Sequence, residues 1–466
     1  MENIVVMKFG GTSVQDADAI RRVAQIVAGV LKAGGRLPVV IVSAMALVTD
    51  GLLSVANSAK AGTLEGSAGA LTHLQQLQTR HLSTARNLFD TRSGGFTQAD
   101  LARVEAAIYE RFAELERLVR SVAELGELTP RTQDAIVSMG ERLSSLLVAA
   151  AFQIHRINRG LVEVDARSFM VTDDQFGSAH PNMDEINRYA NTVLHSVIQS
   201  HAVPVTQGFI GATMERHTTT LGRGGSDYSA AIIGAAIGAE EIQIWTDVNG
   251  MLTADPRIVP NARVVPQMSF GEASELAYFG AKVLHPSTIL PAVKKGIPVR
   301  ILNSLRPEQP GTLISNEAGS SNGPITGISC KRNVTVVDIT STRMLDAHGF
   351  LAEVFEVFKR FKTAIDVVTT SEVSVSVTLD DVRAVEMIRE ALAGFAEVQV
   401  VPEMAIISVV GEKLHDDPTI PAQVLTALGN IPLKLVSQAA SRRNFTFVLR
   451  DDDAPTAMVR LHDRFF

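Results

Sequence analysis

The first 45 residues place an apolar strand, a glycine turn, a helix and a second apolar strand in that order. IVVMKF, residues 4–9, is the first strand, and two glycines break it. Residues 13–34 then carry apolar side chains at helical spacing up to a glycine stop, and residues 37–45, LPVVIVSAM, are apolar again. Strands without polar alternation are typical of parallel sheets covered by helices on both faces. The chain therefore predicts an α/β fold.

The rest of the chain divides into one large domain and two small modules. Residues 53–154 are helical in pattern, with an apolar stripe along residues 101–125 that indicates packing. Strand-like segments then return near residues 161–166, 203–211, 241–248 and 297–303. A stretch rich in Pro, Gly, Ser and Asn follows, and after it the order strand, loop, helix, strand, turn, strand occurs twice, about 70 residues apart. We expect a catalytic-type domain at 1–304, a linker at 305–325, and α/β modules at 326–396 and 397–466.

Composition narrows the classes of partner. The net charge of −7 gives no general attraction to nucleic acid or anionic membranes, and the most apolar stretch, residues 230–239, is too short to span a bilayer. The N-terminus does not have the pattern of a secretory signal. One cysteine, Cys330, allows no intramolecular disulfide and suits a reducing compartment. We expect a cytoplasmic protein that binds neither nucleic acid nor membrane.

Two glycine-rich helix starts could hold anions. Lys8 precedes FGGTS, which offers an ammonium group, two flexible peptide N–H groups at Gly10 and Gly11, and two hydroxyls at a helix N-terminus. The second start, TTTLGRGGSDYSA, places Arg223 among glycines and Ser226 and Asp227 at the mouth of an apolar helix. The plainer interpretations are a glycine turn with a solvated lysine and an ordinary helix cap. Two such starts in one α/β domain favour a nucleotide and a second anion.

A third polar cluster, WTDVNGMLTADPR, follows the strand EIQI and contains Thr246, Asp247 and Arg257. Ligands bind at the carboxyl ends of parallel strands, although an ordinary long loop would have a similar composition. Together with FGAKVLHP, VSMGERLSS and the tail segments GFLAEVF and VTTSEVSVS, these ordered motifs resemble the aspartate kinases of the amino-acid kinase superfamily, of the monofunctional lysine-sensitive type. The resemblance covers nearly the whole chain and is weakest in the helical block.

The resemblance implies a three-layer amino-acid kinase fold, with a mainly parallel sheet, helices on both faces and a helical insertion, followed by two ferredoxin-like ACT modules. It also implies transfer of the γ-phosphoryl group of ATP to the side-chain carboxylate of L-aspartate, which is the first step toward lysine, threonine and methionine. A carboxylate is ionised at pH 7, so the reaction needs positioning and charge neutralisation and no general base.

Residue roles carry over from the family motifs. Lys8 is expected to stabilise the transferring phosphoryl group, and Asp227 to hold that lysine. Arg223 is expected to bind the α-carboxylate of aspartate and Glu141 its α-ammonium, with Thr49 and Ser226 as further substrate contacts. Leu47 departs from the family, which usually has glycine at this position.

The resemblance also implies a nucleotide-binding site. The resemblance assigns ATP contacts to Lys8, Gly10, Gly11, Thr12, Ser13, Thr246, Asp247, Arg257 and Lys282. Leu252 stands where related sequences often carry tyrosine. The sequence offers no carboxylate cage for a metal, so we expect Mg²⁺ to arrive with ATP, coordinated mainly by phosphates and water.

The tail predicts a sensor of L-lysine. In the first module the effector residues are expected to be Met344, Gly349, Phe350, Leu351, Ile365, Asp366, Ser371 and Glu372. Free N–H groups at the helix start suit a carboxylate, and the two acidic side chains suit ammonium groups. Ala347 and Ala364 replace serines found in some relatives. Pairing of exposed sheet edges favours a homodimer through the ACT modules.

Two other functions remain open from the sequence. One is a kinase for another amino acid, such as glutamate or an acetylated amino acid. The other is a catalytically silent amino-acid sensor, in which the kinase fold serves as a scaffold; the presence of both Lys8 and Asp227 weighs against it.

Overall fold

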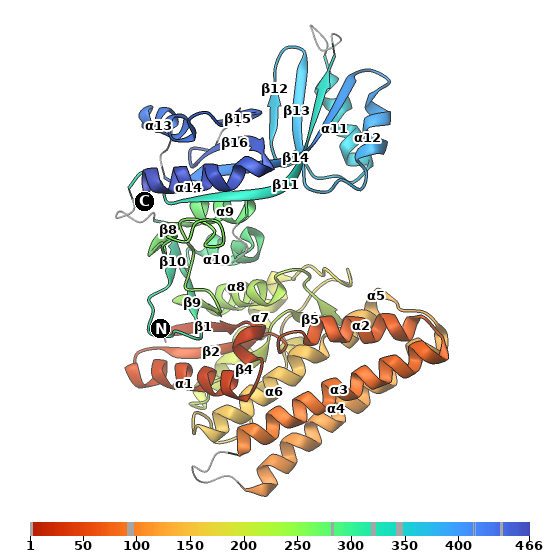
Figure 1. The fold of residues 1–466 in the computed structure, drawn as a ribbon. Helices are drawn as coiled ribbons and strands as arrows, with labels where there is room; N and C mark the ends of the chain where they lie inside the picture. Colours follow the sequence, from red (N-terminus) through yellow and green to blue (C-terminus); the bar gives the residue numbers. More distant parts are fainter. Residues whose placement is uncertain are drawn as a thin grey trace. The chain divides into compact units, whose positions relative to one another are not determined.

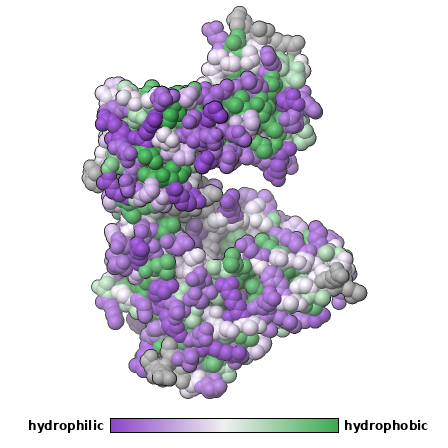
Figure 2. All heavy atoms as spheres, in the orientation of Figure 1, coloured by the Kyte–Doolittle hydropathy of each residue, from purple (hydrophilic) through white to green (hydrophobic). Residues whose placement is uncertain are grey.

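The computed structural model describes residues 3–90, 97–280, 284–317, 323–341, 348–412, 414, 416–438 and 441–466. The predicted ATP contact Lys282 and the predicted effector contact Met344 lie outside these residues. The chain forms two compact units: Met1–Gly250 with Leu284–Asn316, and Met251–Val283 with Glu317–Phe466. Segment 251–283 thus packs with the second unit, although the sequence boundary was drawn at 304. In Figure 2, apolar side chains are scattered among hydrophilic ones on the visible face.

The first unit alternates strands and helices, with five helices inserted between β2 and β3. Its elements are β1 (Ile4–Phe9), η1 (Gly11–Val14), α1 (Ala17–Ala33), β2 (Leu37–Val42), α2 (Val48–Lys60), α3 (Leu64–Phe89), α4 (Gln98–Leu125), α5 (Pro130–Val137), α6 (Met139–Ile154), β3 (Glu163–Val164), η2 (Ala166–Ser168), α7 (Met183–Gln199), β4 (Val205–Gln207), β5 (Ile210–Ala212), β6 (Thr218–Thr220), α8 (Gly225–Ile237), β7 (Glu241–Thr246), η3 (Pro286–Ile289), α10 (Leu290–Lys295), β9 (Val299–Asn303) and β10 (Thr312–Ser315).

The main sheet of this unit confirms the predicted fold class. Its strands lie in the order β3-β4-β2-β1-β7-β9-β10, and every pairing up to β9 is parallel. Helices α1 and α6 pack on one face and α8 on the other, which gives three layers (Figure 1). Because β1 is fully buried at the centre, its alternate side chains enter two different cores.

The helical insertion contains a long hairpin of α3 and α4 (Figure 1). Its predicted apolar stripe is the packing face, since Val104, Ile108 and Phe112 are buried there, whereas Leu125 at its end is 77% exposed. The segment Pro130–Ile154 has the length and apolarity of a membrane span, but 89% of its most apolar window is buried inside the protein. It is divided into α5 and α6 at Ser138, and it serves as a core segment of the unit.

The second unit contains β8 (Gln267–Ser269), α9 (Phe270–Tyr278), β11 (Gly327–Thr340), α11 (Phe350–Arg360), β12 (Val368–Thr370), β13 (Ser374–Leu379), α12 (Val385–Leu392), β14 (Glu397–Val410), α13 (Thr419–Leu428), β15 (Leu435–Ser437), β16 (Asn444–Arg450), η5 (Asp451–Asp453) and α14 (Ala454–Phe465). Six strands form one antiparallel sheet in the order β12-β13-β11-β14-β16-β15.

Two long strands, β11 and β14, run through both modules. The beginning of β11 and the end of β14 share a core with α13 and α14, whereas the end of β11 packs with α11 and α12. Val398, near the start of β14, also packs in that second core, although the sequence boundary at 396/397 assigned it to the other module. Each module therefore uses one half of each long strand, and the two modules share a continuous sheet.

A buried histidine makes the helical hairpin sensitive to acid. The ring of His81 in α3 is fully buried against Phe112, its Nδ1 lies 2.7 Å from the carbonyl oxygen of Leu77, and its Nε2 has no hydrogen-bond partner. Burial lowers the pKa of His81 from 6.5 to about 4.

This shift predicts a loss of stability between pH 6.5 and pH 4. The folded protein resists protonating His81 and the unfolded chain does not, so its contribution is complete above pH 6.5 and falls as the pH drops toward 4. Between pH 7 and pH 5 the free energy of unfolding should fall by about 2 kcal/mol more in the native protein than in His81→Leu. Urea titrations of both proteins at both pH values measure the difference; equal losses would contradict it.

Candidate active site

The site forms where the parallel strands of the first unit end. Residues Val5, Met7 and Phe9 of β1 face the core shared with α1 and α6, so Lys8 points to the opposite face, which α8 covers. There its Nζ lies 2.6 Å from Oδ1 of Asp227 in the first turn of α8. Both side chains are largely buried, at 10% and 17% exposure. The structure thus joins two residues that are 219 positions apart and were both predicted as catalytic.

Glycine is required at the start of α8. Gly224 caps the helix in the left-handed conformation, at φ 71°. A Cβ on Gly225 would lie 2.6 Å from Cδ2 of Phe209, so no larger residue fits there without movement. The two glycines following Arg223 therefore let the chain turn sharply enough to bring Asp227 to Lys8.

A cavity of about 710 Å³ opens beside this ion pair. Its lining includes many of the residues predicted from the sequence, namely Lys8, Gly11, Thr49, Glu141, Arg223, Ser226 and Asp227. It also includes residues that were not predicted, among them Gln133, Asp134, Gly177 and Thr220. The residues predicted to bind the substrate therefore line one cavity within the first unit.

Glu141 brings a bare carboxylate oxygen to the cavity. The side chain is 97% buried at the first turn of α6; Oε1 accepts a hydrogen bond from the backbone N–H of Ala44 at 3.1 Å, and Oε2 has no partner. Burial raises the pKa of Glu141 to about 8. A buried oxygen without a donor is costly, and a ligand that brings a donor or a positive charge would remove that cost.

Arg223 supplies the opposite charge. Its side chain is exposed at the cavity, and no hydrogen bond or ion pair joins it to another residue in the part of the chain that the structure describes. A free guanidinium and a bare carboxylate in one cavity can bind the two ends of an amino acid. Thr49 and Ser226 add hydroxyl groups to the same lining.

The predicted phosphate-binding turn surrounds the end of β1. A Cβ on Gly11 would lie 2.9 Å from the carbonyl oxygen of Ala44, so this turn can pass the neighbouring loop only with glycine. Thr12 is exposed and available to a ligand. Ser13 is buried and its hydroxyl lies 2.7 Å from that of Ser304, which joins η1 to the segment after β9; its ATP contact stays a prediction.

The predicted nucleotide contacts fall into different parts of the structure. Thr246 and Asp247 lie at the end of β7 in the first unit, joined by a hydrogen bond of 3.2 Å. Arg257 belongs to the second unit, where it forms an ion pair of 2.6 Å with Asp255. The ATP contact predicted for Arg257 stays a prediction, as does that of Lys282. Among the described residues, no group of three or more His, Cys, Asp or Glu side chains could hold a metal ion.

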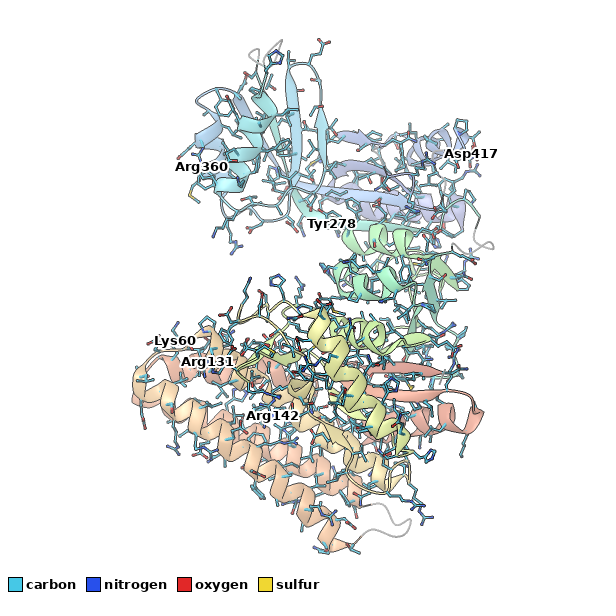
Figure 3. All side chains as sticks on the ribbon, turned by 180° about the vertical axis from the view of Figure 1, so that it is seen from behind. Lys60, Arg131, Arg142, Tyr278, Arg360 and Asp417 are labelled. Carbon is cyan, nitrogen blue, oxygen red and sulfur yellow. The ribbon has the colours of Figure 1, made fainter. Side chains whose placement is uncertain are left out.

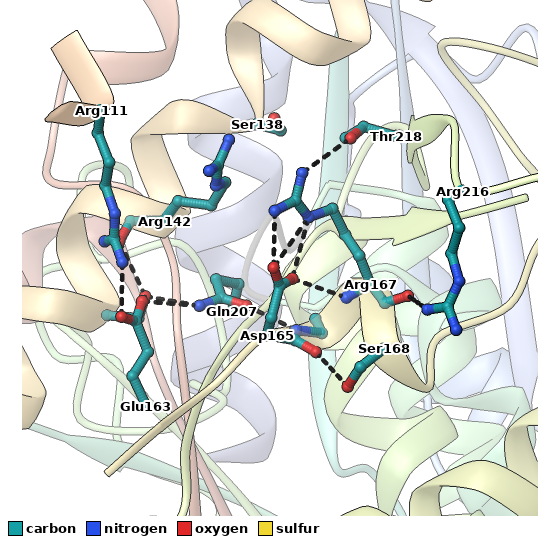
Figure 4. Close-up of polar contacts among 12 residues, drawn as sticks. Arg111, Ser138, Arg142, Glu163, Asp165, Arg167, Ser168, Gln207, Arg216 and Thr218 are labelled. Carbon is teal, nitrogen blue, oxygen red and sulfur yellow. Dashed lines mark hydrogen bonds and ion pairs between the residues drawn. The ribbon is translucent and has the colours of Figure 1, made fainter. Parts of the chain in front are cut away.

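A partly buried polar network supports the wall that carries Glu141 (Figure 4). Glu163 at β3 accepts hydrogen bonds from Arg111 of α4 at 2.6 Å, from Gln207 of β4 at 3.0 Å and from Ser145 of α6. These bonds connect the inserted helices to the end of the sheet. They therefore fix α6, and with it Glu141, relative to the strands.

The predicted effector residues lie in the second unit. Gly349 caps α11 at φ 92°, as expected for a helix start that could expose N–H groups, and Leu351, Ser371 and Glu372 are exposed. Phe350 instead packs its ring in the module core, edge-on to Phe395. Ile365 is partly buried beside the same core.

Asp366 is already engaged within the second unit. Its Oδ2 lies 2.8 Å from Nζ of Lys331, which also pairs with Asp380, and its Oδ1 accepts a hydrogen bond from the hydroxyl of Tyr278 at 3.1 Å. Tyr278, labelled in Figure 3, ends α9. An ammonium group arriving at Asp366 would therefore compete with Lys331, a contact that the sequence did not reveal.

Comparison with known proteins places the chain in a family. The model of the amino acid kinase family matches residues 3–303, and a model of the ACT domain matches residues 407–465. Fold, cavity and family models together define an amino acid kinase with ACT modules. Aspartokinase 3, chloroplastic, of Arabidopsis thaliana is 38% identical over 99% of this chain and 81% of its own length. Lysine-sensitive aspartokinase 3 of Escherichia coli is 34% identical over the full length of both.

Solved structures agree with the sequence relatives. Escherichia coli aspartokinase III in complex with lysine and aspartate matches with a TM-score of 0.80 and 33% identity, covering all of both chains. The same enzyme in complex with aspartate and ADP matches with a TM-score of 0.81 and 32% identity, covering 99% of this chain and all of that one. The chain belongs to the aspartokinase family.

The Leu47 departure from the family has a visible cost. Leu47 caps α2 in the left-handed conformation, at φ 67° and ψ 0°, with 77% of its surface exposed. Non-glycine residues adopt this conformation at a cost of roughly 1 to 2 kcal/mol, which explains why glycine suits the position.

We predict that Leu47→Gly is more stable than Leu47→Ala by about 1 kcal/mol in urea unfolding, because alanine retains the left-handed strain and glycine does not. Both variants lose the exposed leucine side chain, so its small contribution to stability cancels in the comparison. At an ordinary helical position glycine would be the less stable variant by a similar amount. Equal stability, or a more stable alanine variant, would show that Leu47 carries no such strain.

Proposed function

We propose that this chain transfers the γ-phosphoryl group of ATP to the side-chain carboxylate of L-aspartate, giving 4-phospho-L-aspartate, and that L-lysine inhibits it. The observation that carries the proposal is the cavity that joins the Lys8–Asp227 ion pair to a bare Glu141 oxygen and a free Arg223. The membership of the aspartokinase family supports the same reaction.

In this proposal the cavity recognises aspartate as a zwitterion. Arg223 binds the α-carboxylate and Glu141 the α-ammonium, which leaves the side-chain carboxylate to face Lys8. Thr49 and Ser226 contribute hydroxyl contacts. The buried Glu141 carboxyl gains a partner when the substrate binds, so binding removes a desolvation cost there, and the exposed Arg223 adds a charge-assisted contact.

Lys8 performs the main electrostatic work of the transfer. Two anions must approach, so an ammonium group held between them lowers the barrier, and Asp227 keeps it in place. Gly10, Gly11 and Thr12 offer N–H and hydroxyl donors to the phosphates, and Thr246 and Asp247 contact the rest of ATP. The ATP contacts of Arg257 and Lys282 rest on the family resemblance alone. Mg²⁺ enters as part of the ATP substrate, coordinated by phosphates and water.

The proposal includes inhibition by lysine and assembly into a dimer. Lysine binds the first module near Gly349, Asp366 and Glu372, in keeping with the lysine bound to the Escherichia coli relative of 33% identity. Edge strand β12 pairs with a second copy, so the enzyme is a homodimer through its ACT modules. The protein acts in the cytoplasm.

The direct test is acyl-phosphate formation, trapped as hydroxamate, from ATP with aspartate, glutamate or N-acetylglutamate, each with and without millimolar lysine. We expect activity with aspartate alone, suppressed by lysine and lost in Lys8→Met. Activity with glutamate or N-acetylglutamate in place of aspartate would change the assigned substrate. No activity with any of the three acceptors would favour a catalytically silent amino-acid sensor.

The elevated pKa of Glu141 predicts proton release on aspartate binding. In the empty cavity the group is mostly protonated at pH 7, because its pKa is about 8. An ammonium ligand favours the ionised form and lowers the pKa, so binding at pH 7 should release close to one proton. Affinity should then rise by about tenfold per pH unit below 8 and level off above it.

Calorimetry of aspartate binding in two buffers with different ionisation enthalpies measures this release. Glu141→Gln keeps the shape of the side chain and should abolish both the proton release and most of the pH dependence. Binding of native protein without proton release at pH 7 would place the substrate ammonium elsewhere.

Lys331 predicts a specific change in lysine sensitivity. Its ammonium group occupies Asp366, so Lys331→Met should lower the half-inhibitory lysine concentration by about three- to tenfold, as expected from removing one charge-assisted contact. The control is Lys434→Met, which removes a similar ion pair, 2.7 Å from Asp338. An unchanged inhibition curve in Lys331→Met, or full inhibition in Asp366→Asn, would remove Asp366 from the effector site.

A further inference from the structure

Asp134 lies in the wall of the cavity and was not singled out from the sequence. It projects from α5, seven residues before Glu141, and only 1% of its surface is exposed. Burial raises the pKa of Asp134, although the hydrogen bonds to Gly177 and Thr220 oppose the shift. A buried carboxylate beside a substrate cavity requires an explanation from its contacts.

Three donors occupy the two oxygens of Asp134. Oδ2 accepts from the backbone N–H groups of Gly177 and Thr220, each at 2.9 Å, and Oδ1 accepts from the hydroxyl of Thr220 at 2.8 Å. Glu141, in contrast, keeps one oxygen bare. Asp134 is therefore satisfied by the protein itself and is not arranged to bind the substrate ammonium.

The donors belong to two loops that support Arg223. Thr220 ends β6, three residues before Arg223, and its carbonyl oxygen accepts a hydrogen bond from Ala179 N–H at 2.8 Å. Gly222, at φ 75°, approaches the other loop so closely that a Cβ would lie 3.3 Å from the carbonyl oxygen of Gly177. The carboxylate of Asp134 thus joins both loops at the base of the Arg223 turn.

The backbone turn that carries Arg223 determines where its side chain points. Its guanidinium has no partner among the described residues, so its direction toward the cavity follows from the turn that carries it. Pre-organised geometry of this kind raises affinity because the loop need not be ordered on binding. A loosened turn would weaken contact with one end of the substrate and leave the nucleotide contacts intact.

We propose that Asp134 is a positioning residue that sets the Arg223 turn for the α-carboxylate of the substrate. The inference rests on the proposed role of Arg223. It requires a selective rise in KM for aspartate, with KM for ATP nearly unchanged. A purely structural role would instead lower the unfolding temperature without such selectivity.

The experiment compares steady-state kinetics of Asp134→Ala and Thr220→Val with native enzyme. Alanine removes both acceptor oxygens and leaves the backbone N–H groups of Gly177 and Thr220 without their partner, so Asp134→Ala should raise KM for aspartate by about 30-fold, and Thr220→Val, which loses one hydroxyl bond, by about fivefold. KM for ATP should stay within about twofold. Thr220→Ser keeps the hydroxyl and should recover most of the loss. If Asp134→Ala does not fold, the comparison of Thr220→Val with Thr220→Ser still tests the inference.

Thr219→Val is the matched control on the same strand. The hydroxyl of Thr219 is equally buried but lies 2.7 Å from that of Thr172, and Thr219 does not line the cavity. It should leave KM for aspartate unchanged. A rise equal to that of Thr220→Val would reduce the effect to general loss of packing and overturn the inference.

A double-mutant cycle with Arg223→Ala separates the two claims. Arg223→Ala alone should raise KM for aspartate, and adding Asp134→Ala should then change it by less than about twofold, because the contact that Asp134 positions is gone. If the effects of the two substitutions on KM were additive, the positioning role of Asp134 would be wrong and the role of Arg223 would stand. An unchanged KM in Arg223→Ala would overturn the role of Arg223, and the inference with it.

Discussion

The ion pair between Lys8 and Asp227 is the contact on which the site depends. Strand alternation turns Lys8 toward α8, and two glycines let α8 begin close enough for Asp227 to meet it at 2.6 Å. The parallel order of β2, β1 and β7 then brings the loops after these strands to one edge of the sheet. Breaking the pair by removing one partner would leave a buried charge without compensation.

The remaining charges of the cavity complement the proposed substrate. The buried oxygen of Glu141 is unfavourable while it has no partner, the guanidinium of Arg223 is exposed and free, and a zwitterion offers a partner to both. The protein does not let these two groups pair with each other, because separate supports hold them. The Glu163 network fixes α6 on one side, and Asp134 joins the loops beneath Arg223 on the other. The site is thus pre-organised for charges that the substrate brings.

Local patterns in the sequence predicted the α/β fold, the buried first strand and both glycine-rich helix starts, because these depend on neighbouring residues. Glu141 could be recognised only by resemblance, since one glutamate on a helix has no distinctive local pattern. Asp134 was missed because its partners lie 43 and 86 residues away. The contact of Lys331 with Asp366 was missed for the same reason, as was the sharing of β11 and β14 between modules. Tertiary packing decides such features.

The most direct test of the zwitterion cavity is a panel of acceptors. Succinate lacks the ammonium group of aspartate, and β-alanine lacks its α-carboxylate. Native enzyme should prefer aspartate over either by about 100-fold or more in kcat/KM. Glu141→Gln should reduce only the preference for aspartate over succinate. Arg223→Ala should reduce only the preference for aspartate over β-alanine. If each variant lowered both preferences equally, or neither, Glu141 and Arg223 would not bind the two ends of the substrate.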